Sequence, residues 1–181
     1  MRIISGKYKG KRLIAPKKLP VRPTTDMAKE GLFNILNNRF YLDELKVLDL
    51  FAGTGNISFE FASRGAKEII SVDGFPGCIQ YISKTAKELD FPITPIKSDV
   101  YRYLERNREK FNIIFADPPY DFDERLFFQI ADLVFGNGLL LGDGLLIIEH
   151  SSQTDLSRNP YFSEERKYGG SVFSFFEQGS D

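Results

Sequence analysis

Short apolar runs alternate with amphipathic stretches between residues 46 and 149. The runs have the length of single strands, and the stretches between them repeat apolar residues at helical spacing. Strands that lack a polar face are typical of a parallel sheet covered by helices on both sides. We expect strands at residues 47–50, 68–72, 93–97, 111–116 and 144–149, and helices at about 56–64, 76–89, 100–108 and 124–135.

The pattern changes near the C-terminus, where two apolar stretches flank a pair of glycines. Residues 161–168 and 171–177 lie on either side of Gly169-Gly170. Paired glycines suit the tight turn between antiparallel strands. These residues therefore predict a hairpin that closes one edge of the sheet.

The N-terminal segment is also distinct from the alternating region. Residues 2–6 and 11–15 predict two short strands joined by a polar turn. Three prolines within residues 16–23 predict an extended linker, because proline fixes one backbone dihedral and lacks an N–H group. A helix over residues 27–38 follows, with polar capping side chains directly before it.

The expected fold class is α/β, with a Rossmann-like, mostly parallel seven-stranded sheet. It carries a C-terminal antiparallel hairpin and a small N-terminal β-hairpin extension. The chain has 181 residues, of which 42% are hydrophobic, and this suffices for one hydrophobic core. We expect residues 1–23 to form a basic hairpin and linker, and residues 24–181 to form the main domain.

The residue composition narrows the chemistry. Cys78 is the only cysteine and His150 the only histidine, so an internal disulfide is excluded and few metal ligands remain. The longest apolar stretch, residues 139–148, is interrupted by Gly142-Asp143-Gly144 and is too short to span a bilayer. We expect a cytoplasmic protein without a metal ion and without membrane association.

Charge is distributed unevenly along a chain whose net charge is −1. Residues 1–22 hold eight lysines and arginines, and no acidic residue precedes Asp26, so the remainder carries about −9. A basic arm on an acidic body suits a polyanionic partner, although a solubilising tail has the same composition. Six residues interleave positive charge with an aromatic ring and are candidates for RNA contact: Arg2, Lys7, Tyr8, Lys9, Lys11 and Arg12.

A glycine-containing loop, Asp49-Leu50-Phe51-Ala52-Gly53-Thr54-Gly55, ends the first strand of the alternating region. Ligands of open α/β sheets bind beyond the carboxyl ends of such strands. No third glycine follows Gly55 at the spacing of a dinucleotide-binding motif. A carboxylate at Asp49 instead suits a ligand with an amino group and a sulfonium, and S-adenosyl-L-methionine is such a ligand.

Two further acids follow later strands and complete an ordered set with Asp49. Asp73 ends the second strand, where an acid can accept ribose hydroxyls, and Asp99 follows the third strand, where it can contact an adenine amine. Val100 lies beside Asp99, and Phe75 after Gly74 is available for packing. Surface acids are common after strands, so the ordered set carries more weight than any single member.

The segment Asp117-Pro118-Pro119-Tyr120, which we call the clamp, follows the fourth strand. Two hydrogen-bond acceptors can take both N–H groups of an exocyclic amine and turn its lone pair toward a methyl donor. The Asp117 carboxylate supplies one acceptor, and the Pro118 carbonyl, held extended by Pro119, supplies the other. Tyr120 can stack on a flat base. A plain turn with a rim aromatic is the alternative, and Glu149 and His150 can either reach this pocket or pack elsewhere.

Several motifs together carry a resemblance to a known family. They are Arg2-Ile3-Ile4-Ser5-Gly6-Lys7, Gly10-Lys11, Leu13, Arg22-Pro23-Thr24-Thr25-Asp26, Glu30, Leu32-Phe33-Asn34, Leu48 to Gly55, Ser63-Arg64-Gly65-Ala66, Asp117 to Tyr120, Glu149-His150 and Lys167-Tyr168-Gly169. Over nearly its full length the chain resembles the RsmD family of class I S-adenosylmethionine-dependent methyltransferases, which methylate guanine N2 in bacterial 16S ribosomal RNA.

The resemblance implies a substrate, a cofactor site and an assembly state. The partner would be 16S ribosomal RNA or the assembling small ribosomal subunit, and we expect a monomer. Residues expected to line the cofactor site are Arg22, Thr24, Thr25, Asp26, Asp49, Phe51, Ala52, Gly53, Thr54, Gly55, Asp73, Gly74, Phe75, Asp99 and Val100.

Some positions depart from the family pattern. Met27 stands where an arginine is usual, Gly31 weakens a helix, and Asp73 replaces the commoner glutamate before the unusual pair Gly74-Phe75.

Other functions remain open at this point. Adenine N6, cytosine N4 or a glutamine amide suits a similar clamp, and a non-catalytic ribosome-assembly factor could use the fold as a scaffold. The chain has no room for the large target-recognition domain that is usual in DNA enzymes.

Overall fold

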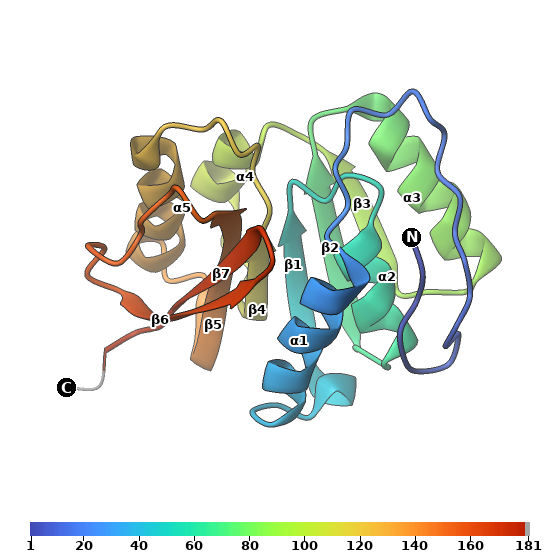
Figure 1. Cartoon of the computed structure of the whole chain (residues 1–181), viewed down its shortest axis with the longest axis horizontal. Helices are drawn as coiled ribbons and strands as arrows, with labels where there is room; N and C mark the ends of the chain where they lie inside the picture. Colours follow the sequence, from blue (N-terminus) through green and yellow to red (C-terminus); the bar gives the residue numbers. More distant parts are fainter. Residues whose placement is uncertain (180–181) are drawn as a thin grey trace.

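A computed structural model of the chain describes residues 1–179. It alternates strands and helices through the middle of the chain and ends in a hairpin (Figure 1). The elements are α1 (Asp26–Asn37), a 3-10 turn η1 (Leu42–Glu44), β1 (Lys46–Leu50), α2 (Asn56–Ser63), β2 (Glu68–Asp73), α3 (Pro76–Glu88), β3 (Ile93–Lys97), α4 (Val100–Arg106), β4 (Phe111–Ala116), α5 (Glu124–Gly136), β5 (Leu140–Ser151), β6 (Phe162–Tyr168) and β7 (Ser171–Phe176).

The seven strands form one sheet in the order β3-β2-β1-β4-β5-β7-β6. All pairs among β1 to β5 are parallel, and only the two pairs that involve β7 are antiparallel. The predicted fold class is therefore confirmed. The chain order reverses between β1 and β4, and crevices at such reversals are where ligands bind in α/β sheets.

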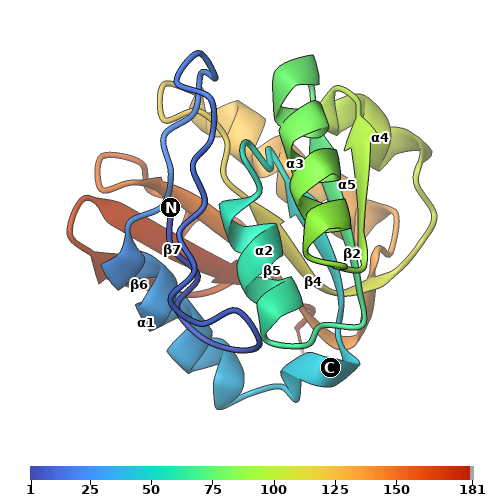
Figure 2. The same cartoon turned by 90° about the vertical axis from the view of Figure 1, so that its right-hand side faces the viewer.

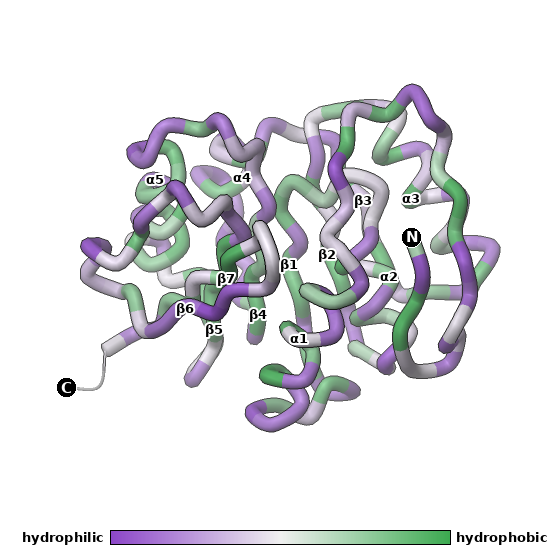
Figure 3. The backbone as a smooth tube through the Cα atoms, viewed as in Figure 1, coloured by the Kyte–Doolittle hydropathy of each residue, from purple (hydrophilic) through white to green (hydrophobic). Residues whose placement is uncertain are grey.

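Two apolar clusters cover the two faces of the sheet. One cluster packs α1 and α2 on alternate residues of β1, β4, β5 and β7, and the other packs α4 and α5 on the opposite face. The central strands are mostly hydrophobic in Figure 3, and most of their side chains are buried. Burial on both faces explains why these strands read as continuous apolar runs.

The N-terminal arm, residues 1–24, begins with the predicted hairpin, but its two limbs pair over only a short stretch. Arg2 and Arg12 form an isolated antiparallel bridge, and backbone hydrogen bonds join Ile3 to Lys11, Gly10 to Ile3 and Leu13 to Met1. The first limb also bonds to α2: the backbone N–H groups of Ile4 and Ser5 donate to the Glu60 carboxylate at 2.8 and 3.1 Å. The arm therefore lies along α2, as Figure 2 shows.

A buried ion pair anchors this arm. The Lys29 ammonium group, on α1, lies 3.5 Å from Glu60 and donates to the Arg2 carbonyl and to the Asn56 side chain. The Lys29 and Glu60 side chains are 1% and 0% exposed. Arg64 supplies a second cation, 2.8 Å from Glu60. A buried carboxylate thus joins the arm to two helices, which sequence patterns alone did not predict.

The strand β5 is longer than predicted. It begins at Leu140 and runs through Gly142-Asp143-Gly144, which reads as an interruption in the sequence. A register shift between Phe111 and Ile113 of β4 absorbs the extra residues. His150 consequently lies within β5, fully buried, with its Nε2 atom 2.7 Å from the Ser174 hydroxyl.

Candidate active site

A cavity of about 740 Å³ opens at the carboxyl ends of β1 and β4. It lies at the reversal of strand order, and the glycine loop after β1 and the Asp117 segment after β4 both line it. The backbone N–H group of Asp117 donates to the Leu50 carbonyl at 3.3 Å, so the two loops leave neighbouring strands side by side. The structure brings together the two motifs that the sequence singles out.

Twelve of the predicted site residues line this cavity: Arg22, Thr24, Asp49, Phe51, Ala52, Gly53, Thr54, Asp73, Asp117, Pro118, Pro119 and Tyr120. Within residues 1–179 the lining does not include Thr25, Asp26, Gly55, Gly74, Phe75, Asp99 or Val100. Their local contacts explain this. Thr25 and Asp99 cap α1 and α4 with their side chains, and Asp26 pairs with Arg2 on the surface.

The glycine loop turns sharply as it leaves β1. Phe51 and Gly53 both have positive φ angles, 55° and 57°, and a Cβ atom on Gly53 would lie 3.2 Å from the Val21 side chain. A positive φ is unusual for a phenylalanine and stores local strain. Edge-to-face contacts with Tyr101 and Phe122 hold the Phe51 ring in place. The turn thus lets the arm and the loop approach each other over the cavity.

Asp49 and Asp73 place two carboxylates in the half of the cavity near β1 and β2. Asp73 accepts the backbone N–H groups of Gly53 and Phe75, at 2.9 and 2.8 Å, and so fixes the glycine loop. Asp49 is 1% exposed and accepts a hydrogen bond from Ser58 at 2.6 Å. Burial raises the pKa of Asp49 to about 7.

The Asp117 carboxyl group is enclosed by other charged groups. Burial raises its pKa well above the usual range, and the negative charge of Glu149 adds to this, while the positive charge of Arg22 opposes it. Glu149 is 1% exposed and accepts a hydrogen bond from Thr24 at 2.6 Å. Arg22 therefore serves as the counter-charge of both carboxyl groups.

Arg22 also covers the aromatic ring of the clamp. Its guanidinium carbon lies 3.3 Å from the centroid of the Tyr120 ring, in a stacked cation–π contact. A base that stacks on this face of Tyr120 must displace Arg22. The sequence pattern placed Arg22 near the cofactor and did not indicate this contact.

Asn56 and the segment Leu19–Val21 line the cavity although sequence reasoning did not select them. Asn56 begins α2 and donates to the Thr24 carbonyl at 3.1 Å. Its position directly after Gly55, at a helix start beside the glycine loop, was a usable signal. Leu19–Val21 carried no signal, because a proline-rich linker gives no indication of what it packs against.

Comparison with known proteins identifies the family. A model of the family described as Conserved hypothetical protein 95 matches residues 1–177. The chain belongs to this family. Ribosomal RNA small subunit methyltransferase D of Escherichia coli (strain K12) is 30% identical over 161 residues, which cover 88% of this chain and 79% of that protein.

Two solved structures relate the fold of this family member to known ones. Hypothetical protein TTHA0928 of Thermus thermophilus is 27% identical, with a TM-score of 0.84 over 98% of this chain and 99% of that chain. The T. thermophilus 16S rRNA N2 G1207 methyltransferase RsmC, in complex with AdoMet and guanosine, is 20% identical, with a TM-score of 0.69 over 89% of this chain and 45% of that chain. The second likeness concerns the fold alone.

Two departures from the family pattern now have a structural setting. Met27 is exposed on α1 and does not line the cavity within the described chain. Gly31 faces the Tyr168 ring, and a Cβ atom there would lie 2.3 Å from the ring carbon Cε1. Gly31 therefore makes room for an aromatic side chain of β6, which accounts for a poor helix former in α1.

Proposed function

We propose that this protein transfers a methyl group from S-adenosyl-L-methionine to the N2 amine of a guanine in 16S ribosomal RNA. One observation carries the proposal: the glycine loop after β1 and the Asp117 segment after β4 line a single cavity. A sulfonium bound by the first loop and an amine bound by the second would then share one cavity, as direct transfer requires. The name of the Escherichia coli relative supports the choice of small-subunit ribosomal RNA.

The cofactor occupies the half of the cavity formed by Asp49, Gly53 and Asp73. Ionised Asp49 suits the positive charge of the ligand. Each carboxylate oxygen of Asp73 accepts one backbone N–H group of the loop and has a further lone pair, which can accept a hydrogen bond from a ribose hydroxyl. The residues present therefore fit a ligand with this charge and a sugar. When it is bound, the cofactor supplies the methyl group.

The target base occupies the half formed by Asp117, Pro118 and Tyr120. The Asp117 carboxylate and the Pro118 carbonyl accept the two N–H groups of the amine, and this frees its lone pair for attack on the methyl carbon. When bound, the cofactor would supply the methyl group and keep the electrons of the broken carbon–sulfur bond; the amine gains the methyl group and loses one proton, for which the Asp117 carboxylate is the adjacent acceptor. Positioning is the main catalytic device in such a transfer. The guanine must be flipped or unstacked to enter.

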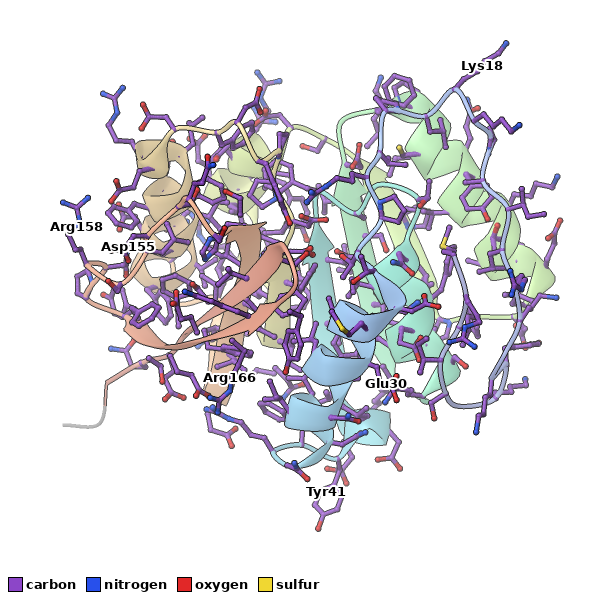
Figure 4. The ribbon with its side chains drawn as sticks, in the orientation of Figure 1. Lys18, Glu30, Tyr41, Asp155, Arg158 and Arg166 are labelled. Carbon is purple, nitrogen blue, oxygen red and sulfur yellow. The ribbon has the colours of Figure 1, made fainter. Side chains whose placement is uncertain are left out.

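The basic arm supplies a surface for RNA. Lys7, Lys9, Lys11 and Arg12 are exposed along it, and Lys18 at its tip points away from the body of the molecule (Figure 4). Tyr8 differs from the others, since its ring packs edge-on against Phe91 and its hydroxyl donates to the Leu89 carbonyl. We assign Tyr8 to anchoring the arm and the basic residues to phosphate contact. We expect the protein to act as a monomer in the cytoplasm, where ribosomal subunits assemble.

Within residues 1–179 no helix is both long and apolar enough to cross a bilayer, and no cluster of three or more potential metal-ligating side chains occurs. The proposed transfer requires neither feature.

Labelled cofactor tests this function against its rivals. Purified protein is incubated with unmodified small subunits, naked 16S RNA, DNA and release factors, and the labelled product is digested and identified. We expect label in N2-methylguanosine from ribosomal RNA. Label in adenine, cytosine or a glutamine side chain would contradict the proposal, and so would no label in any substrate.

A further inference from the structure

Glu149 is a buried carboxylate next to the clamp that the proposed reaction does not yet use. Ala116 of β4 pairs with Ile148 of β5 in the parallel register, so the next residues of the two chain segments, Asp117 and Glu149, lie side by side. Glu149 is 1% exposed, and it is not part of the cavity lining within the described residues. A direct contact between Glu149 and substrate is therefore not its function.

The contacts of Glu149 join three separate parts of the chain. Thr24 of the arm donates to its Oε2 atom at 2.6 Å. The hydroxyl groups of Ser171, at the start of β7, and of Tyr120, in the clamp, lie near this carboxyl group and act to lower its pKa, which burial raises. The Tyr120 and Ser171 hydroxyl oxygens lie 3.2 Å apart. Each oxygen of a carboxyl group can accept a hydrogen bond, so the Glu149 oxygen that Thr24 does not use faces the two hydroxyl groups beside it.

These contacts fix the orientation of the clamp. The Tyr120 hydroxyl is held by Ser171 beside Glu149, and this contact helps to set the plane of the ring that a base would stack on. Thr24 is held two residues after Arg22, whose guanidinium group lies on that same ring. Loss of the Glu149 carboxylate would release the Thr24 side chain and remove the carboxyl group beside Tyr120, while the Asn56 contact to the Thr24 carbonyl and the contacts of the cofactor half of the cavity remain.

We propose that Glu149 is a positioning residue: its carboxylate docks the arm at Thr24 and orients Tyr120, so that the base half of the site is assembled only when the arm is in place. This inference rests on the proposed methyl transfer and deepens it. Glu149 should therefore affect the turnover of bound substrate and leave the affinity for the cofactor unchanged.

The charges around the clamp give this proposal a second, independent readout. Asp117 faces Glu149 from β5, Arg22 from the arm and Asp49 from β1. Glu149 faces Arg22 together with the hydroxyl groups of Thr24, Ser171 and Tyr120. The negative charge of Glu149 helps to raise the pKa of Asp117. Removing that charge lowers this pKa, so Asp117 is ionised at lower pH and the acid limb of the activity profile moves to lower pH.

The test compares Glu149→Gln and Glu149→Ala with Glu165→Gln, a carboxylate on β6 outside the site. We expect Glu149→Ala to lower kcat about tenfold or more, which is the usual cost of one lost hydrogen bond to a charged group, with the KM for S-adenosyl-L-methionine within about twofold of the parent. Glu149→Gln keeps the shape and should retain more turnover, with its acid limb at lower pH. Glu165→Gln should match the parent in both measurements.

A merely structural role predicts a different result. It would reduce stability and the active fraction in both Glu149 variants and leave the acid limb in place, and that outcome overturns the proposal. The NMR signal of the Thr24 methyl group tests arm docking without any reaction. It should shift or broaden in Glu149→Ala, and an unchanged signal also overturns the proposal. If the parent protein methylates no substrate, the proposed function fails, and the Thr24 signal still decides whether Glu149 docks the arm.

Discussion

At the residue scale, the chemistry of the cavity depends on carboxylates whose surroundings differ. Asp73 is fixed by two backbone amides, Asp49 is buried beside Ser58, and Asp117 shares its environment with Glu149 and Arg22. Three similar side chains therefore have three separate roles in the proposed reaction: fixing the loop, balancing a cationic ligand and orienting an amine.

Asp49 gives cofactor binding a dependence on pH. Burial raises its pKa from 3.8 to about 7. In the unliganded protein the protonated form of Asp49 therefore stabilises the fold. This stabilisation is fully present below pH 3.8 and is lost as the pH rises through about 7. A cationic ligand prefers the ionised form. Affinity for S-adenosyl-L-methionine should therefore rise between about pH 5.5 and pH 7.5, by at most about tenfold per unit. Calorimetric titrations at several pH values measure this.

Asp49→Asn removes the titrating group and should abolish most of that pH dependence. Asp132→Asn, on the exposed side of α5, is the matched control and should keep it. Equal pH profiles for the parent and Asp49→Asn would show that another group controls cofactor binding.

At the scale of the elements, α1 shows how packing overrides local preference. Gly31→Ala would improve helix propensity by about 1 kcal/mol, yet its methyl group would meet the Tyr168 ring at 2.3 Å. We expect a net destabilisation of about 1–3 kcal/mol, as for other overpacked sites. Urea unfolding measures this change in the free energy of unfolding.

Gly136→Ala is the control for this substitution. Gly136 ends α5, and a Cβ atom there meets nothing within 4 Å. That variant should be neutral or slightly stabilising. If the Gly31→Ala variant is as stable as the Gly136→Ala variant, the Tyr168 ring does not determine which residue stands at position 31.

The buried pair Lys29–Glu60 determines how the arm attaches. Lys29→Met should cost about 3 kcal/mol, because it removes one partner of a buried ion pair and the donor to the Arg2 carbonyl. The arm should also become sensitive to limited proteolysis. Lys46→Met removes a partly exposed partner of Glu68 and Glu109 and should cost less than about 1 kcal/mol. Similar losses for the two variants would exclude the anchoring role.

The order of elements was predictable because parallel strands that are buried on both faces appear in the sequence as continuous apolar runs. This pattern also places the loops after β1 and β4 at one edge of the sheet, and so predicted that Asp49 and Asp117 lie together. The stacking of Arg22 on Tyr120 and the links of Glu149 were not predictable, because they join residues about 100 positions apart or more. Glu60 was also missed, since a buried charge in an apolar helix is only explained by its distant partners.

At the scale of the whole molecule, positive charge is concentrated on the arm. Lys18 projects from the arm tip, whereas Arg158 and Arg166 lie on the opposite side of the molecule (Figure 4). If the arm contacts RNA phosphates, its lysines contribute to affinity through counterion release. Arg158 and Arg166 instead pair with neighbouring acids.

The double variant Lys9→Ala/Lys18→Ala should weaken RNA binding and reduce the slope of log affinity against log salt concentration by about 2. Arg158→Ala/Arg166→Ala changes the net charge equally and should leave the slope nearly unchanged. Filter binding over a range of salt concentrations distinguishes them. An equal loss in the two double variants would mean that net charge, and not the arm, governs RNA binding.

The most direct test of the account is the turnover of Asp117→Ala on unmodified small ribosomal subunits, measured beside its affinity for S-adenosyl-L-methionine. The account predicts a loss of turnover of roughly 10²-fold or more, as for other preorganised polar contacts, with cofactor affinity nearly unchanged. Normal turnover by Asp117→Ala would contradict the claim that this carboxylate orients the amine opposite the methyl group.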